Sequence, residues 1–273
     1  METKELEKLE ERIAAFPWWY YRFEFEGGVS TPVLGDGMVN RAEQLHGYIL
    51  DALLRATGGS LGGHRVLDLG CNAGLWSLRA IEAGADFVLG VDGLRMAIDQ
   101  ASFVFETKGV DSSRYRFEHG DVFEHEFGEQ FDVVLCLDFM DQVSKPVELF
   151  ELMSGVGAQT IVIETSLSPV PDSYFELCTL EDPLWTPDER MVLVPTREAV
   201  IDLAGEFGFS TVPLAHSFTD FTGLADYQRG RRLAFICSKG ESPDGLAVAP
   251  AHRERPSWIE TVDRGWRSLR GRL

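Results

Sequence analysis

The sequence has 273 residues, of which 44% are hydrophobic and 25% are charged, so it can form one large α/β domain with a sizeable core and a modest appendage. No apolar run approaches the ~18–20 residues of a membrane span, and the N-terminal segment METKELEKLEERIAAF lacks the apolar stretch of a secretory signal, so we expect a cytoplasmic protein. The 44 acidic residues outnumber the 25 basic ones, and the resulting net charge of −19 repels a phosphate backbone and argues against a nucleic-acid partner.

Residues 1–60 are predicted to form a helical and aromatic cap segment. Residues 1–16 have the charged amphipathic pattern of a helix, and the aromatic run FPWWYYRFEF follows. Because consecutive side chains cannot all point one way, at least half of the aromatic residues 18–21 should pack in the core, while the others could form a lid. After the loop GGVSTPVLGDG, apolar residues recur three or four apart from Met38 to Ala56, which predicts another helix.

From residue 61 to residue 239 the chain alternates short apolar strands with helices. The predicted strands are HRVLDLG, FVLGVD, RYRFEHGD, FDVVLCLD and QTIVIET, then a sixth before His216, and finally RRLAFICSK. Near-continuous apolar strands separated by helices indicate a parallel sheet covered on both faces. We therefore predict an α/β catalytic domain over 61–239, with a doubly wound, mostly parallel seven-stranded sheet of the Rossmann-like type.

Two segments fall outside this alternation. Residues 166–195 contain five prolines and little periodicity, which predicts an irregular insertion after the fifth strand that serves as a lid or substrate wall. Residues 240–273 form a C-terminal tail whose end, HRERPSWIETVDRGWRSLRGRL, holds six arginines and three acids. We interpret this end as a solvated helix or a homodimer contact, although it could also touch an acidic partner.

The sharpest motif is VLDLGCNAG at residues 66–74. Gly70 and Gly74 permit close backbone approach to a ligand, and Asn72 tolerates a left-handed conformation. A helix beginning near Leu75 would present unpaired N–H groups, and Asp92 ends the next strand, 24 residues after Asp68. A dinucleotide site needs G-x-G-x-x-G for a pyrophosphate, whereas Asp68 would repel a pyrophosphate and attract an ammonium group. The pattern therefore favours S-adenosylmethionine as the cofactor.

The motifs over residues 64–164 resemble those of the class I S-adenosylmethionine-dependent methyltransferases, with Asn72 in place of the middle glycine of the first motif. This resemblance implies that Asp68 lies near the methionine moiety, Asp92 holds the ribose and Asp121 binds the adenine amino group. The other cofactor-binding residues it implies are Gly70, Cys71, Asn72, Gly74, Gly93, Val122 and Leu137. Asp68 and Asp92 could instead cap helices, and Cys71 could be a small packing residue.

A narrower resemblance suggests a different substrate. PWWYYRFEFEGGVSTP, the segment after the fourth strand and Glu164-Thr165 are similar to sequences of the tRNA wobble-uridine (carboxy)methyltransferases, but Asp141 and Gln142 replace that family's tyrosine and histidine. A carboxylated cofactor would need a cation such as Arg41. Because the net charge disfavours RNA, we expect a small-molecule methyltransferase of natural-product biosynthesis. The alternatives are a tRNA-modifying enzyme and a cofactor-binding regulatory module without catalysis.

Candidate catalytic residues are those near the fourth and sixth strands. Asp141 could take a proton from the acceptor or could simply cap the helix near Lys145, and His216 is the alternative base or an ordinary loop histidine. The substrate-binding candidates are Trp18, Tyr21, Asp138, Gln142 and Tyr174. The four cysteines form no C-x-x-C pair and the six histidines are scattered, so we predict no metal site.

Overall fold

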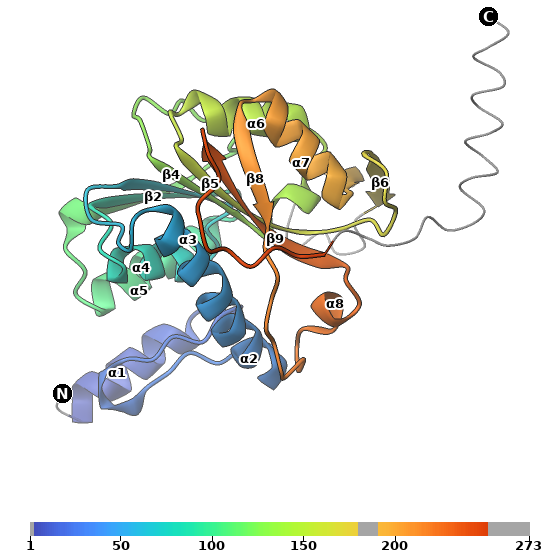
Figure 1. The fold of residues 1–273 in the computed structure, drawn as a ribbon. Coiled ribbons are helices and arrows are strands. Elements are labelled where there is room, and N and C mark those ends of the chain that lie inside the picture. The colour runs from blue at the N-terminus through green and yellow to red at the C-terminus, as the bar shows by residue number, and fades with distance from the viewer. Residues whose placement is uncertain (1–2, 180–190, 251–273) are drawn as a thin grey trace, which may run out of the picture.

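A seven-stranded sheet runs through the middle of the computed structural model, which describes residues 3–179 and 191–250 (Figure 1). Its order is β3-β2-β1-β4-β5-β9-β8. The strands are β1 (Arg65–Leu69), β2 (Phe87–Asp92), β3 (Tyr115–His119), β4 (Val133–Leu137), β5 (Thr160–Ser166), β8 (Phe209–Pro213) and β9 (Arg232–Lys239). Every pairing among β1 to β5 is parallel, and β9 pairs antiparallel with both β5 and β8. The predicted doubly wound, mostly parallel seven-stranded sheet is confirmed.

Helices cover both faces of the sheet because its central strands are apolar on both sides. Along β1, Val66 belongs to one hydrophobic cluster while Leu67 and Leu69 belong to the other. Figure 1 shows α3 (Asp51–Ala56), α4 (Leu75–Glu82) and α5 (Arg95–Thr107) on one face, with α6 (Pro146–Gly155) and α7 (Arg197–Glu206) on the opposite face. Because β1, β2, β4 and β5 are parallel, their carboxyl ends lie along one edge of the sheet.

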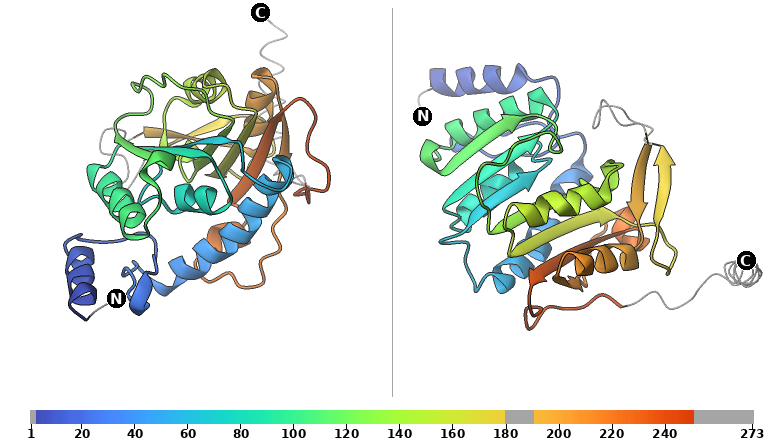
Figure 2. Two further views of the ribbon diagram at one scale, coloured as in Figure 1. Left: turned by 90° about the vertical axis from the view of Figure 1, so that its left-hand side faces the viewer. Right: turned by 90° about the horizontal axis from the view of Figure 1, so that it is seen from above.

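The N-terminal segment packs against the α5 side of this domain. Helix α1 (Thr3–Ala14) lies beyond α5 near one edge of the sheet (Figure 2). Trp19 and Phe23 are almost fully buried, and the ring of Trp19 lies 6.0 Å from that of Phe103 on α5. Tyr20 and Tyr21 remain partly exposed. The aromatic run is therefore divided between the core and a surface next to the sheet edge.

One long helical segment connects this cap to the sheet. It consists of α2 (Asp36–Leu45), a π-helical turn (His46–Leu50) and α3, in agreement with the predicted helix from Met38 to Ala56. Tyr48 in the π-helical turn donates to the carbonyl of Leu214 over 2.6 Å. Near the start of α2, the Asn40 amide donates to the carbonyl of Thr222 over 2.8 Å. These bonds hold α2 against the segment between β8 and β9, which contains α8 (Ala225–Gln228).

The insertion after β5 is more regular than its sequence suggested. Its two ends form β6 (Phe175–Thr179) and β7 (Met191–Pro195), which pair antiparallel as a separate small sheet. The expectation of an irregular segment is therefore wrong at these ends. Pairing between the two strands satisfies their backbone N–H and C=O groups, and the sequence periodicity did not reveal that pairing. Trp185 and the arginine-rich end of the C-terminal tail lie outside the described residues.

Candidate active site

The loop after β1 has a conformation that only particular residues can adopt. Gly70 and Gly74 have φ of 68° and 79°, and Asn72 has φ of 49°, all in the left-handed region that disfavours most side chains. A Cβ on Gly70 would lie 2.6 Å from the ring of Phe139. The side chain of Asn72 accepts the N–H of Ala73 over 2.7 Å. The loop therefore needs glycine at position 70 and a residue such as asparagine at position 72.

Asp92 lies at the carboxyl end of β2, close to this loop. Its two carboxylate oxygens accept the N–H groups of Asn72 and Leu94 over 2.8 and 2.7 Å. Burial raises the pKa of Asp92, and these N–H groups oppose the rise. The neighbouring Gly93 is exposed, and a Cβ there would contact nothing within 4 Å. A carboxylate thus lies beside open space at the sheet edge.

Asp68 has a different environment. Its carboxylate is 2% exposed and accepts the hydroxyl of Ser77, on the first turn of α4, over 2.6 Å. Burial raises the pKa of Asp68 to about 7. Asp68 therefore supports the loop and α4 from within the protein. The N-terminus of α4 follows Gly74, which provides no side-chain cap. The N–H of Ser77 is bound by Asp68, so a negatively charged group could meet the N–H groups that precede Ser77.

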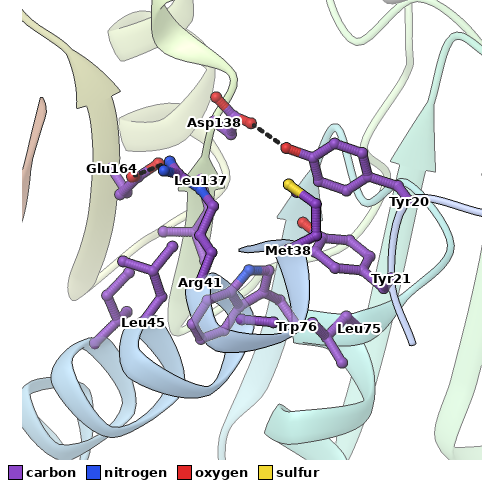
Figure 3. A pocket seen from close by; sticks show the side chains of 12 residues that line it. Tyr20, Tyr21, Met38, Arg41, Leu45, Leu75, Trp76, Leu137, Asp138 and Glu164 are labelled. Atoms are coloured by element: carbon purple, nitrogen blue, oxygen red, sulfur yellow. Dashed lines mark hydrogen bonds and ion pairs between the residues drawn. The ribbon is translucent and has the colours of Figure 1, made fainter. Parts of the chain in front are cut away.

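A pocket opens next to the start of α4, which follows this loop, at the carboxyl ends of β4 and β5 (Figure 3). Aromatic and apolar side chains of the cap, α2 and α4 form its walls, and two carboxylates and a guanidinium lie at its polar side. The lining residues are Tyr20, Tyr21, Met38, Arg41, Ala42, Leu45, Ile49, Leu75, Trp76, Leu137, Asp138 and Glu164. Figure 3 shows Tyr20 pointing toward Asp138 and Arg41 pointing toward Glu164.

A buried ionic network lies behind the polar side of the pocket. Arg232, the first residue of β9, contacts the carboxylates of Asp138, Asp141, Glu164 and Asp226 at 2.7–3.1 Å. Although burial disfavours its charged form, Glu164, Asp138 and Asp141 hold the pKa of Arg232 well above its usual value. Arg41 contacts Glu164 at 3.6 Å and Asp226 at 2.9 Å. Two guanidinium groups therefore face four carboxylates, which leaves the network negatively charged.

Comparisons with known proteins identify the domain whose strand ends border this pocket. A family model described as a methyltransferase domain matches residues 61–180. The chain carries a class I S-adenosylmethionine-dependent methyltransferase domain. The ubiquinone biosynthesis O-methyltransferase of Neisseria meningitidis is 25% identical over 57% of this chain and 71% of its own length.

Two solved structures share the fold of this methyltransferase. The N-terminal domain of EvdMO1, crystallised in the presence of SAH and D-fucose, has a TM-score of 0.66 at 19% identity and covers 88% of this chain and 98% of its own. The 1,6-didemethyltoxoflavin-N1-methyltransferase of Burkholderia thailandensis has a TM-score of 0.55 at 16% identity and covers 88% and 92%. It was crystallised with its substrate and S-adenosylhomocysteine.

The cofactor of this methyltransferase is S-adenosylmethionine, and the residues present fit it. Asp92 provides carboxylate oxygens beside the open space at Gly93, where ribose hydroxyls could donate. The start of α4, which has no side-chain cap, suits a carboxylate. Gly70 and Gly74 place no side chain in the loop, so the backbone there can approach the cofactor closely. When bound, the cofactor supplies a sulfonium-activated methyl group.

The other predicted cofactor residues lie along the same edge but in different environments. Leu137 lines the pocket. Asp121 is exposed and accepts the N–H of Phe123 over 2.8 Å, and Val122 is buried. Cys71 is buried, and its Sγ would lie 2.8 Å from a Cβ on Gly90, so it packs tightly against β2.

The two predicted catalytic residues do not line the pocket. Asp141 is 8% exposed, contacts Arg232 at 3.1 Å and accepts the N–H of Ser166 over 3.2 Å. His216 stacks on Phe218 with a centroid distance of 4.5 Å and meets Tyr227 edge-on. Burial lowers the pKa of His216. Within the described residues, Asp141 thus belongs to the ionic network and His216 to an aromatic cluster behind it.

Of the predicted substrate-binding residues, Tyr21 and Asp138 line the pocket and three others do not. The Trp18 carbonyl accepts the side chain of Gln100 over 2.6 Å. The Gln142 side chain donates to the carbonyl of Asp138. The Tyr174 hydroxyl pairs with that of Ser168 at 2.8 Å, near the small sheet.

Sequence reasoning missed several pocket and network residues. Met38 and Trp76 line the pocket but carry no local signal for it. An apolar residue on a helix gives the same sequence pattern whether it packs in the core or lines a pocket. Arg232 and Glu164 each had a weak signal in the sequence. Arg232 directly precedes the apolar run LAFIC, and Glu164 interrupts the apolar run of β5. Opposite charges in neighbouring apolar strands could have predicted the pair, had the antiparallel register of β5 and β9 been known.

Within the described residues, no helix is long and apolar enough to cross a membrane. No group of three or more histidine, cysteine, aspartate or glutamate residues in that part of the chain is arranged to hold a metal ion.

Proposed function

We propose that this methyltransferase transfers a methyl group from S-adenosylmethionine to a hydroxyl, amine or carbon of a small molecule, in natural-product biosynthesis. The observation that carries the proposal is the pocket beside the loop after β1, walled by Tyr20, Tyr21 and Trp76. Flat aromatic walls suit a compact acceptor with apolar faces. The protein would act in the cytoplasm, and homodimer formation remains a prediction.

Charge supports a small-molecule acceptor over RNA. The net charge of the chain is −19, and the polar side of the pocket holds more carboxylates than guanidinium groups. A tRNA enzyme needs Lys and Arg contacts to phosphates. The relatives described above carry names of enzymes that act on small molecules, namely ubiquinone precursors and a toxoflavin precursor.

Methyl transfer is a direct displacement, so the protein accelerates it mainly by holding two reactants in line in a dry site. Tyr21, Met38 and Trp76 provide aromatic and apolar walls that would exclude water once an acceptor is bound. The contact between the Tyr20 hydroxyl and Asp138, at 3.5 Å, connects the cap to the end of β4. The cap therefore orients the acceptor against the strand ends.

The test is transfer of labelled methyl groups from S-adenosylmethionine into an extract of the source organism, separated into small-molecule, RNA and protein fractions. We expect label in the small-molecule fraction. Label in RNA that is lost on ribonuclease treatment would instead support the tRNA-modifying alternative. Binding of S-adenosylhomocysteine without label in any fraction would support a non-catalytic module.

A further inference from the structure

Asp138 occupies the most constrained position of the pocket. It follows β4 and has a left-handed backbone with φ of 55°, a conformation that only Asn72 shares among the non-glycine residues described. The N–H of Asp138 donates to the carbonyl of Glu164 over 2.8 Å, and the side chain of Gln142 donates to the carbonyl of Asp138. Strained backbone held by surrounding bonds is concentrated at functional sites. Here it turns one carboxylate toward the pocket.

The two carboxylate oxygens of Asp138 have different partners. Oδ1 lies 2.7 Å from Nη1 of Arg232. Oδ2 faces the Tyr20 hydroxyl at 3.5 Å, which is the outer limit of a hydrogen bond. The Asp138 side chain is 34% exposed, whereas those of Glu164 and Asp141 are 2% and 9% exposed. The Asp226 side chain is 33% exposed, but both of its oxygens accept from Arg41 and it does not line the pocket. Oδ2 of Asp138 is therefore the network oxygen that both faces the pocket and is accessible to a bound molecule.

We propose that Asp138 is the catalytic residue that binds the reacting hydroxyl or amine of the acceptor and takes its proton. This inference rests on the proposed function. As the acceptor oxygen or nitrogen bonds to the methyl carbon, the carbon–sulfur bond breaks and its electron pair remains on sulfur. The proton leaves the acceptor atom for Oδ2. Arg232 keeps Oδ1 in place, so that Oδ2 keeps its direction during this transfer.

The same geometry determines the charge class of the acceptor. The Arg41 guanidinium is already bound by Asp226, through bonds of 3.0 and 2.9 Å, and by the carbonyl of Gly223. Arg232 is 8% exposed and is surrounded by carboxylates. Among the described residues that line the pocket, an anionic acceptor near Asp138 and Glu164 would meet no cation that is not already paired. The pocket therefore selects neutral or cationic acceptors that present hydrogen-bond donors.

This assignment differs from the one based on sequence, which favoured Asp141. Asp141 Oδ2 is bound by Arg232 and by the N–H of Ser166, and Asp141 does not line the pocket. The two aspartates share Arg232, so replacing either disturbs the same network. Only Asp138 adds contact with the acceptor.

The experiment compares Asp138→Asn with Asp86→Asn. Asparagine fits a left-handed backbone, and Asp86 is the control because it is exposed before the opposite end of β2, where it accepts the N–H of Gly63 over 2.9 Å. The purified variants are incubated with labelled S-adenosylmethionine and the small-molecule fraction of the extract, freed of RNA and protein and divided by ion exchange into anionic, neutral and cationic pools. S-Adenosylhomocysteine affinity, measured by calorimetry, verifies that each variant is folded.

We expect the wild type to label the neutral or cationic pool and Asp138→Asn to be slower by about 10²–10⁴-fold, the usual contribution of a general base. Asp86→Asn should stay within about fivefold of the wild type, because removing an interaction outside the pocket changes no contact with the acceptor. Label in the anionic pool, or equal turnover by Asp138→Asn and the wild type, overturns the inference while small-molecule methylation stands. Absence of label from all three pools overturns the proposed function and the inference together.

Discussion

The guanidinium of Arg232 lies 2.7 Å from the carboxylate of Glu164, and both side chains are buried. They come from antiparallel neighbours, β9 and β5, and are separated by 68 positions in the chain. Tyr227 donates its hydroxyl to the other oxygen of Glu164 over 2.7 Å. Burial raises the pKa of Glu164, and Arg232 opposes that rise. The pair thus connects the last strand to the pocket through charges that have almost no access to water.

Removing Arg232 should destabilise the protein strongly. Arg232→Met leaves several buried carboxylates without their cation, so we expect the free energy of unfolding to fall by about 3–5 kcal/mol. Urea denaturation followed by circular dichroism measures it. Adding Glu164→Gln to Arg232→Met should recover part of the loss, because it removes one uncompensated charge. A loss below about 1 kcal/mol would mean that water compensates these carboxylates. Arg232→Lys serves if the methionine variant does not fold.

Asp68 should make stability depend on pH. The folded protein keeps the Asp68 proton up to about pH 7, whereas the unfolded chain releases it near pH 3.9. Because the folded state then binds more protons between these values, the contribution of Asp68 to stability falls as pH rises from about 4 to 7. Asp68→Asn should therefore gain on the wild type across this range, by up to roughly 4 kcal/mol.

Denaturation of both proteins at pH 5, 6, 7 and 8, without cofactor, measures this difference. Asparagine can still accept the Ser77 hydroxyl, so the loss of that bond should not obscure the trend. Asp99→Asn is the control, because Asp99 is exposed on α5. A stability difference between Asp68→Asn and the wild type that stays constant with pH would show that Asp68 is ionised throughout.

Gly70→Ala should weaken both folding and cofactor binding. A left-handed alanine costs about 1–2 kcal/mol, and its Cβ would lie 2.6 Å from the Phe139 ring. We expect affinity for S-adenosylhomocysteine to fall at least about tenfold, since roughly 1.4 kcal/mol of loop distortion corresponds to that factor. Calorimetry tests it. Gly155→Ala, in open space near the end of α6, should leave affinity unchanged, and equal affinity of both variants would contradict the role of the loop.

Asp92→Asn should reduce cofactor affinity and also lower stability, because asparagine has one oxygen for the two N–H groups, of Asn72 and Leu94, that the carboxylate accepts. Hydrogen bonds to a charged group contribute about 1.5–3 kcal/mol, so the dissociation constant for S-adenosylhomocysteine should rise about 10–100-fold. Asp86→Asn is the matched control, because Asp86 precedes the opposite end of β2 and accepts the N–H of Gly63 over 2.9 Å. If Asp92→Asn bound as tightly as the wild type, the ribose would have to be held elsewhere.

The sequence by itself determined the fold and the cofactor. Apolar strands alternating with helices left few topologies, and the residues at 68–74 and 92 require a tight turn at consecutive strand ends. These signals are local, because each depends on the backbone freedom or burial of a short segment. The expected division of the aromatic residues 18–21 between core and surface also followed from local geometry, because consecutive side chains point in different directions. Trp19 is buried, while Tyr21 lines the pocket.

Only the tertiary structure decided which polar residues meet. Asp138 and Asp141 are three positions apart in the sequence, yet one lines the pocket and the other is bound behind it. The difference arises from the left-handed turn at Asp138 and from Arg232, which arrives from β9 through an antiparallel register. Coulomb interactions and burial depend on distances across the fold, and no spacing along the chain encodes those distances.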